Sequence, residues 1–362
     1  MNRCAALGLI IVILGLLTSC TQRQGLNSLL DNYHYRLSNV FEFEPSNNLL
    51  DIDENSLPSY PSRRELQQPL SPVSVNLLEF LRLSRCDLQR LIGERNSSLG
   101  KFMPDSQMLV YHLRFIALAK TCRDTLVSVD NHSLAQAVAD ARQTKINDLP
   151  KVRWNASFAS QEFQQLFSHA APPLTLTETA SDSAALTQAL RYLQQFLLIE
   201  AEDTLPSFTK LESHYAVVAS DKFIGRLLRS QLVLVNVLSV LSDQIELANK
   251  ERPLCPAGSL TPRGKVMQQV FLRFYIGEIQ PYISGIYRQS RDVKQVIEDY
   301  LLLWPEYESQ VFSAYWQQAW SDTQPTSIWQ QYNRAVSRHT QVWQQQLQAC
   351  GLRPGNNQIN GK

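Results

Sequence analysis

Residues 93–101, Gly-Glu-Arg-Asn-Ser-Ser-Leu-Gly-Lys, invite comparison with a phosphate-binding loop, because such a loop ends in a glycine-lysine pair. The loop also needs a glycine five positions before its second glycine and a hydroxyl after the lysine. Arg95 and Phe102 stand at those positions. We therefore expect no nucleotide and interpret the segment as a solvated helix end. The alternative is a polar surface on which Glu94, Arg95 and Lys101 contact a partner.

The histidines are too far apart along the chain for a helical metal site. No two of them stand three or four positions apart, the spacing that places two imidazoles on one helix face. They are His34, His112, His132, His169, His214 and His339. We therefore predict no metal and no cofactor. His339 shares a helix face with Val336 and Trp343, which favours a core imidazole bonded to a neighbour over a catalytic base.

Other catalytic signatures give no stronger signal. The chain contains no GxSxG or HExxH motif. Acidic residues stand close together at two places and could form a pair for hydrolysis, but a solvated helix surface explains them better. These residues are Glu200, Glu202, Asp203, Glu306 and Glu308. We predict no catalytic residue.

The N-terminus has the pattern of a secretion signal that ends at a modified cysteine. Arg3 precedes an apolar stretch that is too short to span a bilayer, and the stretch ends in Leu-Thr-Ser-Cys at residues 17–20. This ending resembles the lipobox of bacterial lipoproteins, which implies that residues 1–19 are removed and that Cys20 carries lipid. Thr21, where an aspartate would favour the inner membrane, favours the outer membrane, with the body facing the periplasm. A secreted protein with a chance cysteine is the alternative.

Four cysteines remain once Cys4 leaves with the leader and Cys20 takes lipid. In an oxidising compartment they predict two disulfides, for which three pairings exist. We prefer Cys86 with Cys122 and Cys255 with Cys350, because each pair lies within one half of the chain. One difficulty is that an ideal hairpin would not bring Cys86 opposite Cys122 unless a helix breaks near Ser84. Four buried free thiols are the alternative.

Charge and composition exclude some classes of partner and of fold. Removal of the leader takes Arg3 and leaves equal numbers of basic and acidic residues, so no basic field exists to bind nucleic acid. The chain is 44% hydrophobic and has only 13 glycines, which suits packed helices better than a turn-rich β fold. We therefore predict an all-α, multi-helix bundle built from helical hairpins.

The pattern along the chain divides it into an anchor, a connector, a body and a tail. Residues 20–41 contain the lipid anchor and an amphipathic helix, and the proline-rich residues 42–72 form an extended connector. Residues 73–350 form the helical periplasmic domain, with a sub-boundary at 171–182, and residues 351–362 form a disordered tail. Several helices are expected inside this domain. The first three cover about 75–92, 106–126 after an N-cap at Ser106, and 134–146. A short helix follows an N-cap at Ser160, and another begins at Ser183. The last three cover 222–250 in the bundle centre, a segment from Pro262 with a kink at Pro281, and 329–350.

Three segments together resemble an uncharacterised Gram-negative lipoprotein family, the domain of unknown function 3080 family. The resemblance covers most of the chain after the leader and implies no activity. The residues that carry it are Tyr60–Leu66 (YPSRREL), Leu91–Lys101 (LIGERNSSLGK) and the pattern Trp329, Tyr332, His339, Trp343 and Cys350.

The absence of catalytic motifs favours a noncatalytic role. We expect a lipid-anchored helical scaffold or adaptor of the cell envelope that binds another envelope protein. Its contact surface is either a polar turn or the C-terminal third, which is rich in tryptophan and tyrosine. An envelope hydrolase whose site is assembled only in space is the alternative.

Overall fold

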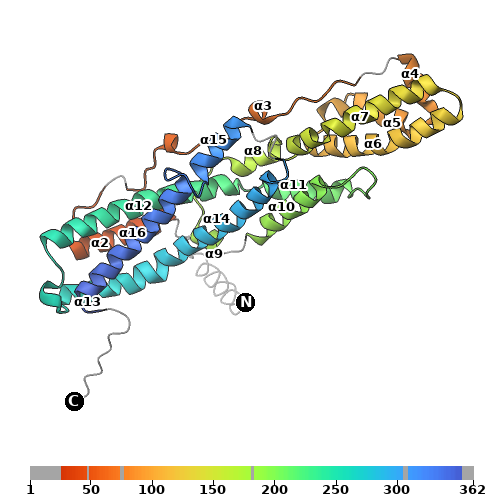
Figure 1. Cartoon of the computed structure of the whole chain (residues 1–362). Helices are drawn as coiled ribbons and strands as arrows, with labels where there is room; N and C mark the ends of the chain where they lie inside the picture. Colours follow the sequence, from red (N-terminus) through yellow and green to blue (C-terminus); the bar gives the residue numbers. More distant parts are fainter. Residues whose placement is uncertain (1–25, 47–48, 74–76, 181–182, 305–308, 353–362) are drawn as a thin grey trace, which may run out of the picture.

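The computed structural model describes residues 26–46, 49–73, 77–180, 183–304 and 309–352. Its regular elements are helices, which confirms the predicted all-α class. Figure 1 shows them packed lengthwise into an elongated bundle. The leader, Cys20, the tail from residue 353 onward, Glu306 and Glu308 lie outside the described residues.

The elements follow one another through the whole chain. In the first half they are α2 Leu26–Phe41, η1 Glu54–Ser56, α3 Arg63–Leu66, α4 Leu77–Arg82, η2 Leu83–Arg85, α5 Asp87–Asn96, η3 Gly100–Phe102, α6 Asp105–Ser128, α7 His132–Asn155, α8 Gln161–Phe167 and α9 Leu176–Ala180. In the second half they are α10 Ala184–Leu197, α11 Phe208–Ala219, α12 Phe223–Glu251, η4 Pro256–Gly258, α13 Pro262–Val270, η5 Phe271–Ile279, α14 Gln280–Leu301, α15 Gln310–Ala319 and α16 Ile328–Ala349.

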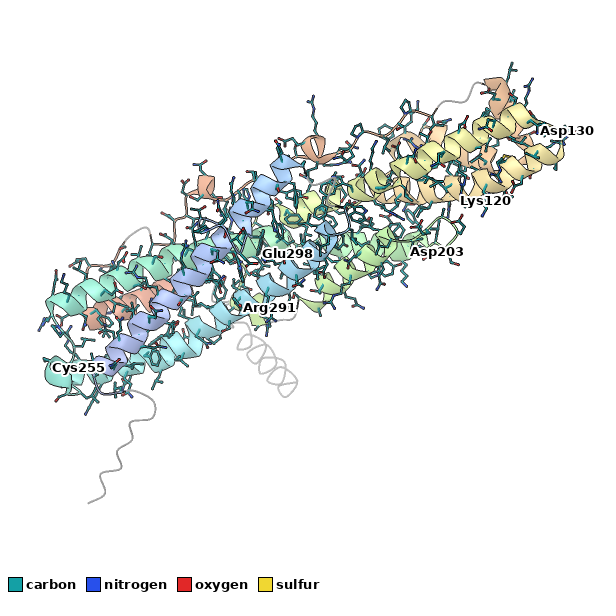
Figure 2. The ribbon with its side chains drawn as sticks, in the orientation of Figure 1. Lys120, Asp130, Asp203, Cys255, Arg291 and Glu298 are labelled. Carbon is teal, nitrogen blue, oxygen red and sulfur yellow. A yellow bond between two sulfur atoms is a disulfide. The ribbon has the colours of Figure 1, made fainter. Side chains whose placement is uncertain are left out.

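Buried apolar side chains form two clusters. The main core draws on α2 and on residues from Leu49 to Cys350, and it includes both sides of the segment 171–182. The distal core is smaller and lies between α5, α6 and the first half of α7. Figure 2 labels Asp130 at one end of the molecule, beside the distal core, and Cys255 at the other.

A break in the helix before α5 explains how the first disulfide forms. After α4 the chain makes one 3₁₀ turn and then adopts an extended conformation at Cys86 (φ −118°, ψ 137°) before α5 begins. Cys86 is bonded to Cys122 of α6, with Cα atoms 5.3 Å apart. The break falls at Ser84, where the preferred pairing required one, so this pairing is confirmed.

The second disulfide closes the opposite end of the bundle. Cys255 follows α12, Cys350 follows α16, and their Cα atoms are 5.1 Å apart. This pairing is also confirmed. Gly264 of α13 packs directly on the bond, because a Cβ there would lie 2.6 Å from the Cys255 Sγ atom.

The helix α12 is the central element of the main core. It packs lengthwise against α16, and most of its apolar side chains from Ile224 to Ile245 are buried. Within the described residues one helical run, Phe208–Glu251, is long and apolar enough to cross a membrane, but 67% of its most apolar window is buried inside the protein. The packing of the bundle therefore accounts for this composition.

Some helix ends differ from those expected. The first residue of α6 is Asp105, after Pro104, because the Ser106 hydroxyl donates to the Glu212 carboxylate (2.9 Å) instead of capping the helix. The helix expected at 134–146 continues to Asn155 as α7 and contains Pro150. The helix α11 was not expected from the sequence. By contrast, Ser160 caps α8 as its position suggests, accepting from the Phe163 N–H.

Residues 42–72, which we call the strap, run in an extended path along much of the molecule (Figure 1). Near the start of the strap, the Asn236 amide of α12 donates to the Leu49 carbonyl at 2.8 Å, and Arg229 of α12 forms two short contacts with Glu54. The predicted extended connector is therefore held to the bundle along its length.

The last part of the strap is fixed by α7. The Trp154 indole donates to the Leu66 carbonyl at 2.8 Å. The Asn155 side chain accepts from the Gln68 N–H at 2.8 Å and donates to the Gln68 carbonyl at 2.9 Å, as a neighbouring strand would. The buried Asp148 carboxylate accepts from the Ser71 N–H at 2.6 Å. The strap thereby connects the main core to the helices of the distal core.

The segment 171–182 is attached to two long helices. The buried Arg226 guanidinium of α12 donates to the carbonyl of Pro172 and to both carboxylate oxygens of Glu178. Tyr282 of α14 donates to the Leu174 carbonyl at 2.9 Å. These bonds hold a proline-rich loop, which includes the short helix α9, against the main core.

Candidate binding site

The turn at residues 94–103 joins α5 to α6 and is held by its own hydrogen bonds. The Arg95 guanidinium donates to the Gly100 carbonyl at 2.6 Å, and the Ser97 hydroxyl accepts from the Gly100 N–H at 3.1 Å. Gly100 is required, because a Cβ there would lie 2.3 Å from the Glu94 carbonyl oxygen. Arg95 is thus used to close the turn, whereas Glu94 and Lys101 are exposed.

Two apolar side chains project from this turn. Leu99 is 88% exposed and Phe102 is 87% exposed, and Lys101 lies between them. Burial of both side chains against a partner would remove apolar surface from water, which makes this hydrogen-bonded turn a candidate contact surface. The sequence pattern drew attention to the charges of this turn and missed its leucine and phenylalanine.

The histidines considered for catalysis are dispersed. His112 is buried between α6 and α7, where its Nε2 atom lies 3.4 Å from the Lys145 ammonium. Burial lowers the pKa of His112 to about 3 and also lowers the pKa of Lys145. His214 of α11 stacks on Tyr192, with ring centroids 3.9 Å apart.

His339 lies in the main core and links α16, to which it belongs, to two other helices. Its Nε2 atom is 2.7 Å from the Tyr33 hydroxyl of α2, and its Nδ1 atom is 3.0 Å from the Ser242 hydroxyl of α12. The Ser242 hydroxyl donates to the Leu238 carbonyl, so His339 Nδ1 carries the proton given to Ser242, and Nε2 accepts from Tyr33. Tyr33 in turn accepts from the Trp343 indole at 2.8 Å. Burial lowers the pKa of His339 to about 3, which keeps the ring neutral.

The acidic residues that follow α10 form surface pairs. Glu200 lies 3.1 Å from Arg153, and Glu202 lies 3.8 Å from Lys120. Asp203 accepts from the Glu200 backbone N–H at 2.9 Å. Within the described residues, no group of three or more histidine, cysteine or acidic side chains is arranged to hold a metal ion.

An apolar groove of about 710 Å³ lies beside the hydrogen-bond network of His339, Tyr33 and Trp343. One side of the groove is formed by η5 and the start of α14, and the other by the facing side of α16. Four of its lining residues, Tyr275, Ile283, Trp343 and Leu347, are buried. Phe271, Val336 and Thr340 form its half-buried walls, and Ile276, Gln280, Ser284 and Gln344 form its exposed rim. We call this the η5–α16 groove; in Figure 1 its two walls are the helix running from α13 into α14 and the helix α16.

The comparisons with known proteins identify one family. Residues 30–354 match the profile of a family described as protein of unknown function (DUF3080). The chain belongs to the DUF3080 family. This confirms the resemblance seen in the sequence. No curated protein and no solved structure matches the chain.

In this DUF3080 protein the matched region includes the strap, the distal core, nearly all of the main core, the 94–103 turn and the η5–α16 groove. Of the residues that carried the resemblance, Tyr332 and His339 are buried and take part in hydrogen bonds. Trp343 and Cys350 are likewise buried, the first in the groove and the second in the disulfide. These residues serve the core.

The DUF3080 sequence gives only an indirect sign of the groove. Its helical wall η5 is a π-helix, in which the Gln280 N–H donates to the Tyr275 carbonyl five residues earlier. Pro281 follows, and a proline ring clashes with the carbonyl four residues before it in an α-helix, so a wider turn relieves the clash. Pro281 predicted a kink, and the structure has a nine-residue π-helix, Phe271–Ile279, that ends two residues before it.

Proposed function

We propose that the protein is a noncatalytic helical scaffold or adaptor of the cell envelope, anchored in the outer membrane by lipid on Cys20 and facing the periplasm. The leader and the Leu-Thr-Ser-Cys ending at residue 20 support the anchor. The elongated bundle supports a scaffold role, because its length separates two ends that are each closed by a disulfide.

The 94–103 turn is the proposed contact surface for a protein partner. The observation that carries this proposal is the exposure of Leu99 and Phe102 on a turn that Gly100 and Arg95 hold in one conformation. A preorganised apolar contact loses little conformational freedom on binding. Lys101 adds a positive charge at the centre of the surface, which favours an acidic rim on the partner.

In-cell photocrosslinking tests this surface. A photoreactive amino acid placed at position 99 or position 102 should yield a discrete adduct with another envelope protein. The same amino acid at position 247 is the matched control, because Leu247 is 58% exposed and lies in the last turns of α12, near the end of the molecule that carries Cys255. Phe102→Ser should weaken the adduct formed from position 99.

An adduct of the same size and yield from all three positions would count against a specific contact. Failure to obtain any adduct from positions 99 and 102, in cells where the protein is folded and anchored, would contradict the adaptor proposal.

The anchor is tested separately by fatty-acid labelling. Cys20→Ala should abolish the label and leave an uncleaved or mislocalised precursor. Cys4→Ala is the matched control, because Cys4 lies within the proposed leader and should not affect the label. Label that persists in Cys20→Ala would contradict the assignment of the lipid to this cysteine.

A further inference from the structure

The η5–α16 groove has a lining that distinguishes it from the neighbouring hollow. None of the side chains that line it is charged. On the opposite face of η5, the hollow between α2 and α13 is lined by Arg36, Arg273 and Glu278. The absence of charge is therefore a property of the groove and does not extend to all surfaces of this helix. A ligand that fits the groove is uncharged along the part that enters it.

Four of the polar side chains of the groove, Tyr275, Thr340, Gln280 and Ser284, are engaged in hydrogen bonds within it. The Tyr275 hydroxyl lies 3.0 Å from the Thr340 hydroxyl, and Thr340 donates to the Val336 carbonyl at 2.9 Å. The Gln280 amide donates to the Ser284 hydroxyl at 3.0 Å. A ligand would gain little from hydrogen bonds to these groups, so its affinity must come from the removal of apolar surface from water.

The π-helix determines which residues face the groove. Phe271, Tyr275 with Ile276, and Gln280 recur at steps of four to five residues, as the wider π-helical turn requires. An α-helical turn would instead rotate these side chains progressively out of line. Here the consequence is a straight apolar wall along one side of the groove.

The opposite side and the floor are rigid. Trp343 of α16 packs against Phe271, with ring centroids 5.0 Å apart, and against Tyr275 at 5.8 Å. Beneath them Tyr33 accepts from the Trp343 indole, which fixes the orientation of the ring. The groove is therefore preformed, and its volume of about 710 Å³ lies in the range of small-ligand pockets.

From this geometry we propose that the η5–α16 groove binds one acyl chain of a membrane lipid. An acyl chain is narrow, uncharged and free of hydrogen-bonding groups, as the lining demands. The inference relies on the proposed anchor only for access: five residues separate Cys20 from Leu26, so the first residue of α2 would lie within about 20 Å of the lipidated cysteine. The helix α2 carries Tyr33, whose ring stacks on Tyr275 in the groove.

The ligand is a separate lipid and not the anchor itself. Membrane binding strengthens with each methylene that the bilayer buries, so an anchor chain placed in the groove would weaken the tether.

The test uses cells that express the full chain and incorporate a photoreactive fatty acid into their lipids. After irradiation, purification and digestion, we expect lipid adducts on peptides from residues 271–284 and 336–347. Ser284→Trp and Val336→Trp fill the groove from its two walls and should lose these adducts. Leu247→Trp, at a 58% exposed position on α12 outside the groove, should keep them. Thermal unfolding of each variant verifies that it is folded.

Three outcomes would overturn the inference. The first is an absence of adducts in the groove while Cys20 is labelled, which leaves the anchor proposal intact. The second is a groove peptide joined to the acyl chain on Cys20, which makes the anchor the occupant. The third is equal labelling in the folded Ser284→Trp variant. Groove adducts in a protein that lacks the lipid on Cys20 would support the groove and contradict the anchor.

Discussion

At the scale of single residues, the buried polar groups of the main core form a chain of paired donors and acceptors. Trp343 donates to Tyr33, Tyr33 to His339, and His339 to Ser242. Satisfied networks of this kind specify one arrangement of the helices that carry them, because an unpaired member would be costly. The neutral state of His339 is part of that arrangement, and it makes stability depend on pH.

We expect the protein to lose stability in mild acid through His339. The pKa of this imidazole is about 3 in the folded protein and about 6.5 in an unfolded chain. Between these values the unfolded chain binds the proton and the folded protein does not. The contribution of His339 is therefore full above about pH 6.5 and is lost as the pH falls toward about 3, with about 2 kcal/mol lost by pH 5.

Urea unfolding at pH 7.5 and pH 5.0 measures this effect. His339→Gln should lower stability at both values but show a pH dependence about 2 kcal/mol smaller than that of the wild type. His132→Gln, at an exposed position, should keep the wild-type dependence. A His339→Gln variant with an unchanged pH dependence would contradict this account.

Gly225 of α12 is expected to tolerate no side chain. A Cβ at this position would lie 2.1 Å from the Ser168 carbonyl oxygen, which belongs to the backbone and cannot rotate away. Gly225→Ala should therefore cost about 1 to 3 kcal/mol in the free energy of unfolding. Gly93→Ala is the matched control, because its Cβ would meet only the Phe80 ring at 3.9 Å. This second substitution should stabilise α5 by up to about 1 kcal/mol.

At the scale of elements, the strap depends on a few side chains that imitate a neighbouring strand. Asn155→Ala should remove both bonds to Gln68 and leave its backbone groups unpaired, at a cost of about 1 to 3 kcal/mol. Hydrogen exchange should accelerate at residues 66–71, and limited proteolysis should cut there first. Asn147→Ala is the matched control, because Asn147 lies on the exposed face of α7, and it should change neither measurement. Uniformly faster exchange over the whole chain would argue for global destabilisation instead.

Periodicity predicted the elements whose apolar faces are strong. The face of α2, from Leu26 to Phe41, the cap at Ser160 and the start of α13 at Pro262 all follow from local pattern and chemistry. The distribution of the cysteines favoured both disulfides. For the helices the decisive residues lie close together in the sequence, and for the disulfides only three pairings were possible.

The attachment of the strap could not be predicted, because it depends on single polar residues far away in the sequence. Asn236 and Leu49, for example, are 187 positions apart. The groove was missed for a different reason. The residues of η5 fit an α-helical pattern well enough to be assigned to one, and the π-helical register is seen only in the backbone hydrogen bonds, such as that from Gln280 to Tyr275.

At the scale of the whole molecule, each disulfide holds one end of the bundle. Replacing Cys255 and Cys350 with serine should cost about 4 to 5 kcal/mol, and replacing Cys86 and Cys122 about 4 kcal/mol, in the loop-entropy model. The location of the effect is more informative than its size. Loss of the Cys255–Cys350 bond should accelerate hydrogen exchange near the C-terminal end of α16. Loss of the Cys86–Cys122 bond should accelerate it in α5 and α6. Faster exchange at both ends after the loss of one bridge would show that the two cores unfold together.

The contact between Tyr33 and His339 also has a consequence in time, since the two residues are 306 positions apart. During synthesis α2 and the strap emerge early, whereas α16 is made last. The apolar face of α2 therefore has no helix to pack on until α12, α13 and η5 are made, and Tyr33 has no hydrogen-bond partner until α16 is made. Such non-local pairing slows folding. A nascent chain that stops before residue 328 has no partner for Tyr33 on α16. The main core is therefore completed only when α16, which is made last, packs beside Tyr33 of α2.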